Sequence, residues 1–178
     1  MNNVEMERAL IKRYRTKIFS PFCKAINDYD LIQENDKIAV CMSGGKDSFV
    51  LAKLFQELKK HGKINFEVKF LVMNPGFNKE NLDRLIENAE KMNIPIKIKE
   101  SNVFKVSQLL GEGQPCYLCA KMRRGFLYDF AKEEGCNKIA LGHHFNDVIE
   151  TTLLNLFYAG TFKTMVPKLK STNHPGME

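Results

Sequence analysis

The sequence predicts an α/β protein, with a parallel sheet, helices on both of its faces and a helical segment before it. The main observation is that short apolar runs alternate with amphipathic segments of helical period between residues 38 and 158. Parallel strands joined by crossover helices produce this alternation. A second observation is that no internal repeat or low-complexity segment interrupts the pattern. We expect an N-terminal helical segment over residues 1–35 and one α/β domain over residues 36–178.

The elements are assigned from apolar spacing, taken in chain order. Residues 4–29 are predicted to be helical, with a break or restart at Ser20-Pro21, because Ser suits an N-cap and Pro the first turn. The predicted strands cover residues 38–42, 66–73, 94–100 and 138–144. The helices after them cover residues 46–61, 81–92, 122–130 and 148–158, and Gly62 and Gly135 end the first and third of these. A loop over 101–119 contains Gly111, Gly113 and Pro115.

The composition is that of an ordinary globular domain. Of the 178 residues, 44% are hydrophobic and 27% are charged, which is enough for one well-buried core. No apolar run approaches the roughly 20 residues of a membrane span, and the charged N-terminus is unlike a signal peptide. We therefore expect a cytoplasmic protein that does not enter membranes.

The net charge of +6 is concentrated in three clusters. The clusters are Arg8, Lys12, Arg13, Arg15 and Lys17; Lys121, Arg123 and Arg124; and Lys163, Lys168 and Lys170. Each cluster alone is compatible with a solvated helix face. Three of them on one small chain favour a polyanionic partner such as nucleic acid.

The rule for parallel sheets places ligands outside the carboxyl ends of the strands. That rule selects four segments of this chain, at residues 43–48, 73–77, 101–119 and 143–147. The chemically unusual residues of the sequence fall in these segments, so we expect the functional site there.

The first segment lies in the stretch CMSGGKDS, residues 41–48. It is not a Walker A loop, because Asp47 separates Lys46 from Ser48. Gly44 and Gly45 allow close backbone approach, and the helix that follows offers unpaired N–H groups to phosphate. Ser43 and Ser48 add hydroxyl donors, and Lys46 adds a cation. Asp47 suits the first helical turn and could help to hold Mg²⁺; the alternative is a plain turn with an acidic cap.

Five cysteines in a chain without a signal peptide argue against a disulfide framework. Only Cys116 and Cys119 form a C-x-x-C pair, for which three roles compete. A redox dithiol would follow an early strand directly, a zinc site needs four ligands, and an iron–sulfur cluster needs more than two thiolates. The start of a helix and the basic cluster nearby would lower the pKa of both thiols.

The fourth segment contains His143 and His144, followed by Asn146 and Asp147. A histidine pair at a strand end is often structural, with its ring nitrogens bound to backbone carbonyls. At this edge the pair could instead bind phosphate, and Asp147 could ligate Mg²⁺ or orient the base to be modified.

The motif S-G-G-K-D-S resembles the PP-loop of the ATP pyrophosphatases, which cleave ATP between its α and β phosphates. The stretches CYLCAKMRRGFLYDFAKEEG and KIALGHHFNDVIETTLLNLFYAGTFKTMVPKL are similar to the tRNA 2-thiocytidine biosynthesis family of these enzymes. The resemblance covers nearly the whole chain from residue 38. It implies ATP-dependent adenylation of a cytosine C2 oxygen in a tRNA anticodon loop, followed by sulfur transfer.

The resemblance also implies roles for particular residues. Nucleotide contacts would come from Ser43, Gly44, Gly45, Lys46, Asp47, Ser48, Met73, Asn74, Gly142 and His143. Catalytic roles would fall to Lys46, Asp47, Asp147 and Lys121. Cys116 and Cys119 would ligate a [4Fe-4S] cluster. The implied cofactors and partners are ATP, Mg²⁺, tRNA, a sulfur donor such as a cysteine desulfurase, and a second copy of the chain in a homodimer.

Two departures from the family pattern matter. Asn146-Asp147 stands where the family has two aspartates, and the family's third cysteine ligand is not found before Glu178. Cys41, in a strand, and Cys136, at the opposite edge of the sheet, are not expected to replace it, so a C-terminal portion is expected beyond Glu178. The alternatives are a lysidine-synthetase-like adenylating enzyme and a non-catalytic module that binds ATP and tRNA.

Overall fold

The computed structural model describes residues 3–110 and 115–178, and its centre is a four-stranded parallel sheet in the order β3-β2-β1-β4. The strands are β1 (Lys37–Met42), β2 (Glu67–Asn74), β3 (Ile96–Glu100) and β4 (Lys138–Leu141). Val40 in β1 pairs with Phe70 on one side and with Ala140 on the other. The four predicted strands are confirmed, although β4 ends at Leu141, three residues before the predicted end.

The helices follow the predicted alternation. They are α1 (Asn3–Arg8), the π-helical turns η1 (Ala9–Arg13) and η2 (Arg15–Phe19), α2 (Ser20–Asp28), α3 (Lys46–His61), α4 (Lys79–Lys91), α5 (Val103–Leu110), α6 (Pro115–Glu133) and α7 (Phe145–Tyr158). Helix α3 has the predicted bounds and ends at Gly62, whose N–H donates to Leu58 O. Gly135, with a φ of 73°, follows the end of α6. In the described part of the chain, none of these helices combines the length and hydrophobicity that a bilayer span requires.

Two local predictions are wrong. The segment predicted as a loop contains α5, which starts where Ser101 Oγ accepts a hydrogen bond from Val103 N (3.1 Å) and which packs against α6. Gly111 and Gly113 of that segment lie outside the described residues. Ser20 does not cap α2, because Phe19 before it already has a helical backbone (φ −67°) and Ser20 is the first residue of α2. Pro21 then falls in the first turn, as predicted.

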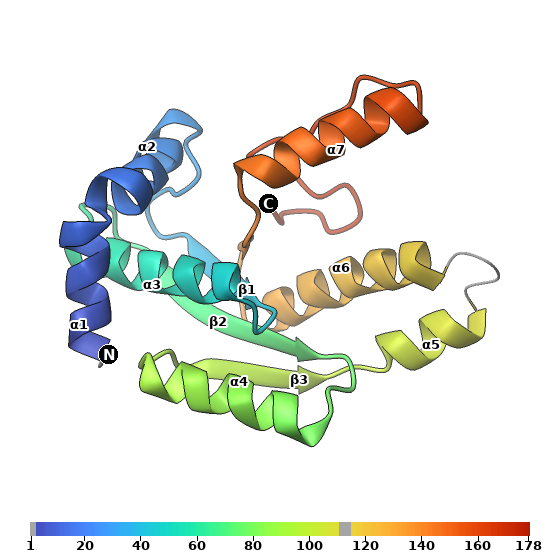
Figure 1. Ribbon diagram of the computed structural model, residues 1–178, viewed down its shortest axis with the longest axis horizontal. Helices are drawn as coiled ribbons and strands as arrows, with labels where there is room; N and C mark the ends of the chain where they lie inside the picture. Colours follow the sequence, from blue (N-terminus) through green and yellow to red (C-terminus); the bar gives the residue numbers. More distant parts are fainter. Residues whose placement is uncertain (1–2, 111–114) are drawn as a thin grey trace.

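Helices cover both faces of the sheet, as predicted. On one face, alternate β1 side chains such as Val40 pack with Phe55 of α3 and Leu85 of α4. On the other face, Ala39 and Leu71 pack with Phe130 of α6. Figure 1 shows β2 and β3 side by side and pointing the same way, with α5 and the start of α6 beyond their ends. The carboxyl ends of the strands therefore share one edge.

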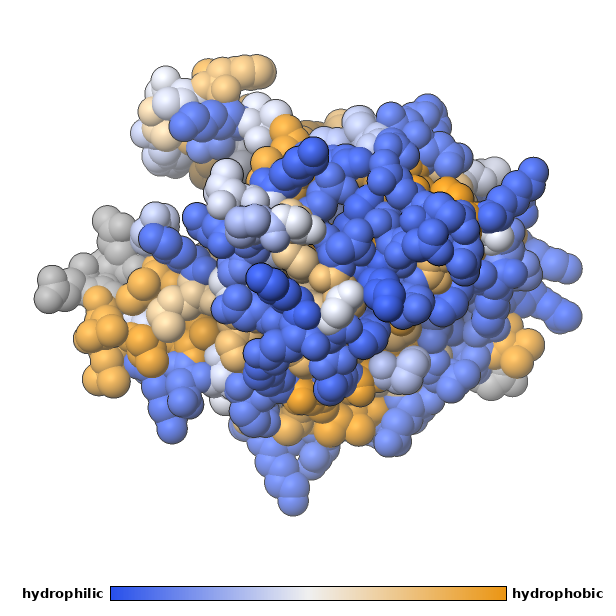
Figure 2. All heavy atoms as spheres, turned by 180° about the vertical axis from the view of Figure 1, so that it is seen from behind, coloured by the Kyte–Doolittle hydropathy of each residue, from blue (hydrophilic) through white to orange (hydrophobic). Residues whose placement is uncertain are grey.

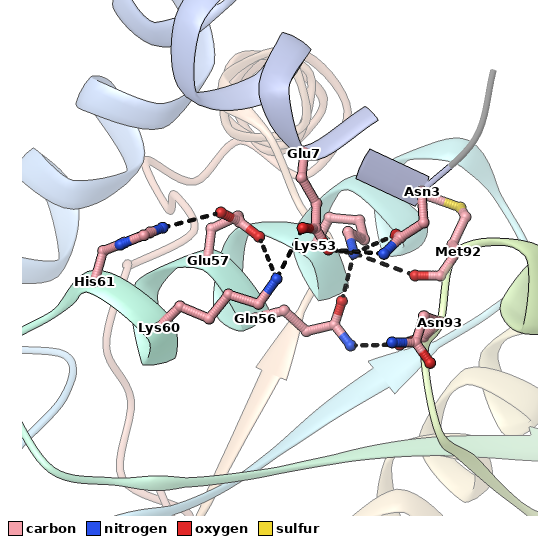
Figure 3. A network of polar contacts seen from close by, with 9 residues as sticks. All are labelled: Asn3, Glu7, Lys53, Gln56, Glu57, Lys60, His61, Met92 and Asn93. Carbon is pink, nitrogen blue, oxygen red and sulfur yellow. Dashed lines mark hydrogen bonds and ion pairs between the residues drawn. The ribbon is translucent and has the colours of Figure 1, made fainter. Parts of the chain in front are cut away.

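A buried lysine fastens the N-terminal helices to this core (Figure 3). The Lys53 side chain of α3 is 4% exposed, and its Nζ donates to Glu7 Oε1 at 2.8 Å and to Asn3 Oδ1 at 2.9 Å. It also donates to Gln56 Oε1 and to Met92 O after α4. These contacts compensate for burying a charge, which would otherwise be costly. Burial alone would raise the pKa of Glu7, but hydrogen bonds from Lys53 and Lys60 outweigh it and lower this pKa to about 2.

The depressed pKa of Glu7 predicts a pH-dependent contribution to stability. Glu7→Gln should lower the free energy of unfolding at pH 7 by about 2 kcal/mol, because the charge-assisted hydrogen bonds from Lys53 become neutral. The folded pKa lies below 4.5, the ordinary pKa of a glutamate side chain. The contribution is therefore complete above pH 4.5 and is lost as the pH falls toward 2. Urea unfolding of the protein and the variant at pH 7 and pH 3 measures the difference.

Glu80→Gln is the matched control for this prediction, because Glu80 pairs with Arg84 on an exposed face of α4. Exposed pairs of this kind contribute little, so the control should unfold like the unmodified protein. An equal loss of stability in the two variants would show that burial of the Lys53 pair is not the cause.

Candidate nucleotide-binding site

The loops that follow the four strands contact one another at the carboxyl edge. His144, after β4, is close enough to Asp47, after β1, to help lower the pKa of its carboxyl. Ser101 N, after β3, donates to Asn74 O at the end of β2 (2.8 Å). Segments far apart in the sequence thus form one surface, as the parallel sheet predicts.

The loop between β1 and α3 is held in shape by its own two serines. Ser48 Oγ donates to Gly45 O at 2.8 Å and accepts from Ser43 N at 3.3 Å. Gly45 N donates to Ser43 Oγ at 3.4 Å. Ser48 is only 4% exposed. Its side chain therefore orders the loop, and the phosphate-binding role expected for this hydroxyl remains a prediction.

Gly44 turns the chain back toward the sheet. Its φ of 84° lies in the left-handed region, and a Cβ at this position would lie 3.0 Å from Leu85 Cδ1 of α4. Only glycine meets both conditions without strain. The turn directs the backbone of Gly45 to the start of α3, where unpaired N–H groups and the helix dipole attract anions.

Lys46 and Asp47 bring opposite charges to the same helix start. Lys46 Nζ lies 2.9 Å from both carboxylate oxygens of Asp47, and its side chain is 83% exposed. The hydrogen bond from Lys46 is the main cause of the lowered pKa of Asp47, which keeps this carboxylate ionised. A cation and a carboxylate at a helix start can hold phosphate oxygens directly and through a divalent metal ion.

Gly142 packs directly against this helix start. A Cβ at Gly142 would lie 3.3 Å from Ser48 N and 3.4 Å from the Asp47 carbonyl carbon. Both neighbours are backbone atoms, so neither can move away without shifting α3. Gly142, expected to contact nucleotide, therefore packs the loop after β4 against residues 43–48, which we call the phosphate-side loop.

Asn74 and Met73, expected beside the adenine, have buried side chains. Asn74 is 4% exposed; its Oδ1 accepts from Gly76 N and Phe77 N, and its Nδ2 donates to Glu100 Oε1 at 2.8 Å. Met73 is 7% exposed. Nucleotide contact through these two side chains stays a prediction. Glu100 was not expected at the site, and its only signal in the sequence is its position at the end of a strand.

Asp147 caps helix α7. Its Oδ2 accepts from His144 N at 2.7 Å and lies 3.4 Å from His144 Nδ1. His143 and Asn146 are exposed beside it. The bond from His144 N fixes the corner after β4. The Asp147 side chain is 33% exposed, so its carboxylate remains within reach of solvent. Its predicted part in metal binding or catalysis is not tested by this geometry.

The cysteine pair opens α6, as predicted. Cys116 is exposed and Cys119 is partly exposed, and Arg123 Nη2 lies 3.9 Å from Cys119 Sγ. The Arg123 guanidinium also stacks on the ring of Phe104 in α5, 5.7 Å from its centroid. The sequence does not predict this contact, because α5 lies in a segment, residues 101–119, that has the glycines typical of a loop. Lys121 is exposed on the same helix.

The described residues offer few metal ligands besides the cysteine pair. Within residues 3–110 and 115–178, no group of three or more His, Cys, Asp or Glu side chains is arranged to hold a metal ion. Burial raises the pKa of Cys41 to about 12, and burial also raises the pKa of Cys136. Both thiols are buried in the core, and, as expected, neither joins the pair.

A cavity of about 580 Å³ lies away from this edge, between the N-terminal helices and the end of α3. Phe19, Ile26, Leu58 and Phe66 are among its lining residues. Because α3 ends and β2 begins there, the cavity belongs to the amino edge of the sheet. It is therefore separate from the candidate site.

A parallel α/β sheet with a glycine turn and a helix start after its first strand is typical of nucleotide-binding proteins. Residues 10–173 match the model of the PP-loop domain family. The chain belongs to the PP-loop family.

Curated relatives of this chain are more specific than the family model. A tRNA-cytidine(32) 2-sulfurtransferase of Neisseria meningitidis is 45% identical over 154 residues, covering 84% of this chain and 47% of the relative. One from Francisella tularensis is 41% identical over 170 residues, covering 93% of this chain and 62% of the relative. This chain therefore spans about half to three fifths of the length of these relatives.

A solved structure supports the fold. The U34-tRNA thiolase NcsA of Methanococcus maripaludis, described with its [4Fe-4S] cluster, has a TM-score of 0.60 and 27% sequence identity. The match covers 76% of this chain and 48% of NcsA. The predicted family and fold class are confirmed by these comparisons together.

The close contact at Gly142 predicts a sensitive position. Gly142→Ala should lower the free energy of unfolding by about 1–3 kcal/mol, because the added methyl presses on the backbone of α3. The affinity for a non-hydrolysable ATP analogue should fall with it, by roughly tenfold for a shift costing about 1.4 kcal/mol. Urea unfolding and calorimetric titration measure the two effects.

Gly125→Ala is the matched control, since a Cβ at Gly125 in α6 would meet nothing within 4 Å. Alanine favours helix by about 1 kcal/mol over glycine, so the control should be as stable as the unmodified protein or more so. If Gly142→Ala behaves like this control, the close approach does not constrain the site.

Proposed function

We propose that this protein is an ATP-dependent tRNA sulfurtransferase that converts a cytidine of the tRNA anticodon loop into 2-thiocytidine. The observation that carries the proposal is the 41% identity to a tRNA-cytidine(32) 2-sulfurtransferase along 93% of this chain. The phosphate-side loop and the cysteine pair supply the two kinds of chemistry that such a reaction needs. Modification of tRNA implies a cytoplasmic location.

The first half-reaction uses the loop after β1. ATP binds with its β and γ phosphates on the backbone of Gly44 and Gly45 and on the N–H groups at the start of α3. The C2 oxygen of cytosine attacks the α-phosphorus, forming an O–P bond as the bond to the β-phosphate oxygen breaks. Lys46 neutralises the leaving pyrophosphate, since its exposed ammonium can turn from Asp47 to a phosphate.

Magnesium fits the same place. Asp47 is held ionised at the start of α3, and the Asp147 carboxylate lies after the neighbouring strand. Oxygen ligands of this kind, completed by phosphate oxygens and water, suit Mg²⁺. We propose that Asp47 would hold the ion, which would neutralise charge on the phosphates, and that Asp147 orients the base or completes the ligand set.

In the second half-reaction, a sulfur nucleophile attacks C2 of the adenylated cytosine and AMP leaves with the former C2 oxygen. The sulfur comes from a donor system such as a cysteine desulfurase. Lys121, Arg123 and Arg124 are exposed on α6 next to the cysteine pair. We propose that they neutralise phosphates of the nucleotide or the tRNA and so hold the base near the thiolates.

Two thiolates fit part of an iron–sulfur site. Cys116 and Cys119 stand at a helix start, and Arg123 Nη2 lies 3.9 Å from Cys119 Sγ. A [4Fe-4S] cluster with one open iron needs three thiolates, so a third ligand must come from outside the described residues. Bound in this way, the cluster would supply the sulfur that attacks C2.

A second candidate is a module that binds ATP and tRNA without chemistry. Asn146 favours it, because the family pattern has aspartate at this exposed position before Asp147. A lysidine-synthetase-like enzyme, which adenylates without adding sulfur, is disfavoured by the cysteine pair. Release of pyrophosphate with tRNA present separates the binding module from both enzymes.

The loop geometry predicts the products of ATP cleavage. With bulk tRNA and labelled ATP, the protein should release pyrophosphate and form AMP or an adenylated RNA. Lys46→Ala should slow this release by roughly 30- to 1,000-fold, an electrostatic loss of about 2–4 kcal/mol in the barrier. Lys91→Ala, at an exposed pair with Glu87 far along α4, should leave the rate unchanged. ADP as the main tRNA-dependent product would exclude the proposed cleavage.

Changes at the cysteine pair should affect iron binding and sulfur transfer but not adenylation. In protein purified without oxygen, Cys116→Ala or Cys119→Ala should remove bound iron and its broad visible absorbance, and should abolish 2-thiocytidine formation. Adenylation should persist, because the phosphate-side loop is untouched. Cys23→Ala, at a half-buried thiol in α2, is the control and should keep its iron. Stoichiometric zinc without iron, in protein that still thiolates tRNA, would contradict the cluster proposal.

A further inference from the structure

The first half of helix α6 is basic, and its charges are open to solvent. Residues 115–128 contain Lys121, Arg123 and Arg124 and no Asp or Glu. All three cations are exposed. Within residues 3–110 and 115–178, no ion pair involves any of the three. Their charge is therefore not neutralised by the part of the chain that the structure describes.

The second half of α6 has its charges paired instead. Glu133 forms an ion pair with Lys99 of β3, and Asp129 Oδ1 lies 3.4 Å from His174 Nδ1. The unpaired positive charge of α6 is thus confined to the half of the helix that begins with the cysteine pair. A concentration of positive charge without acidic partners attracts polyanions.

Three exposed side chains of this first half share one face of the helix. Tyr117, Lys121 and Arg124 are spaced four and three residues apart, so they lie within about 60° of the helix surface. We call these three residues the α6 stripe. Tyr117, the residue of the stripe nearest the helix start, is 68% exposed. The stripe thus presents one aromatic ring followed by two cations along about 10 Å of helix.

Arg123 belongs to a different face of α6. Its Nη2 lies 3.9 Å from Cys119 Sγ, and its guanidinium lies over the ring of Phe104 in α5. Consecutive residues of a helix point about 100° apart, so Arg123 is turned away from Arg124. The basic cluster that the sequence shows is therefore divided. Arg123 lies with the cysteine pair against α5, and the other two cations lie on the open face.

The surface around the α6 stripe is open at one end of the molecule. Figure 2 shows this end from behind, at the left of the view, where α5 ends and α6 begins and hydrophobic surface lies beside hydrophilic surface. Leu109 and Leu110 of α5, 80% and 68% exposed, supply apolar surface there. Beside the stripe, Ala120 is exposed, and a Cβ at Gly125 would meet no described atom within 4 Å. An extended ligand can therefore approach the stripe along its length.

An exposed aromatic ring beside cations is the combination that binds single-stranded RNA. The cations neutralise backbone phosphates, and the ring accepts the face of an unstacked base. Duplex RNA offers the phosphates, but its bases are stacked within the helix and cannot reach the ring. The α6 stripe therefore fits the loop of an RNA better than its stem.

We propose that the α6 stripe holds the nucleotide next to the target cytosine, with its base stacked on Tyr117 and the flanking phosphates on Lys121 and Arg124. The identity of the RNA rests on the proposed function. Tyr117 follows Cys116 directly but points about 100° away from it around the helix. A base stacked on Tyr117 therefore leaves the cysteines uncovered, and the neighbouring cytosine can face them. Tyr117 is in this way a positioning residue, which fixes the strand and takes no part in bond making.

Binding of a stem-loop RNA tests the role of the ring. The probe is an end-labelled anticodon stem-loop that contains the target cytosine, and its fluorescence anisotropy reports binding. Tyr117→Ala should weaken binding roughly 5- to 150-fold, the range expected for the loss of one base–aromatic stack. Tyr117→Phe keeps the ring and should bind like the unmodified protein. Tyr29→Ala, at a tyrosine after α2 that is 51% exposed, is the control and should also bind normally.

Two further RNA probes identify the base that the ring holds. Each lacks one base, on the 5′ or the 3′ side of the target cytosine. One of the two should bind the unmodified protein about as weakly as the complete RNA binds Tyr117→Ala. Combining that probe with Tyr117→Ala should cost no more than either change alone, since both remove the same contact. Fully additive losses with both probes would overturn the stacking.

The salt dependence of binding tests the two cations. Each phosphate contact to a single strand contributes about 0.7 to the slope of log K against log salt concentration. Lys121→Gln and Arg124→Gln should each lower this slope by about that amount, while Tyr117→Ala should leave it unchanged. Lys91→Gln, at the exposed pair with Glu87 in α4, is the control and should keep the full slope. Unchanged slopes for both stripe variants would remove the cations from the proposal.

Iron content, measured on the same samples, separates the ring from the cysteine pair. It should be equal in all of these proteins, because the α6 stripe lies on a different face of the helix. A loss of RNA affinity that follows iron content would overturn the proposal. Normal RNA affinity of Tyr117→Ala would also overturn it, and would favour an acidic protein as the partner of the two cations. If the unmodified protein binds no stem-loop RNA, the proposed function itself fails.

Discussion

Parallel pairing of β1 with a strand on each side is the constraint on which the rest of this structure depends. Because β2 and β4 both run parallel to β1, every connection must cross back over the sheet as a helix. The crossings place the large hydrophobic cluster under α3 and α4 and the smaller cluster under α6. The same constraint brings the loops after all four strands to one edge, where the glycine turn, the histidine pair and the cysteine pair are found.

At that edge, close contacts at two glycines leave no room for a larger side chain and hold the loops in place. Gly44 must accommodate Leu85 while its φ is positive, and Gly142 must lie against the backbone of α3. Ser48 uses its hydroxyl to hold the loop. Of the two charged side chains of this loop, Lys46 is exposed and Asp47 is partly exposed. The backbone of this loop is fixed, and its charged side chains are exposed. Such a loop can bind an anion without first being reordered.

The sequence was sufficient to predict the fold where the hydrophobic period is strong. Helix α3 and strand β1 have the predicted bounds almost to the residue, because their apolar faces are long and are ended by glycines. Helix α5 was missed because eight residues beside two glycines give little periodic signal. Contacts between distant segments were out of reach: the burial of Lys53 depends on Glu7 and Met92, which lie 46 and 39 residues away. The site residues could be predicted from their positions at strand ends. The hydrogen bond from Asn74 to Glu100 could not, because it joins two different strands.

The position of β4 in the sheet has a consequence for the order in which a growing chain can fold. Strands β1, β2 and β3 and the helices that cover the large cluster are complete by residue 100. Their packing can therefore begin while the remaining residues are still being synthesised. Strand β4 must then find the other side of β1, where Asn137 Oδ1 binds Lys37 N across 100 residues of sequence. Until it arrives, that side of β1 is an unpaired, apolar strand edge, open to other nascent chains and to chaperones.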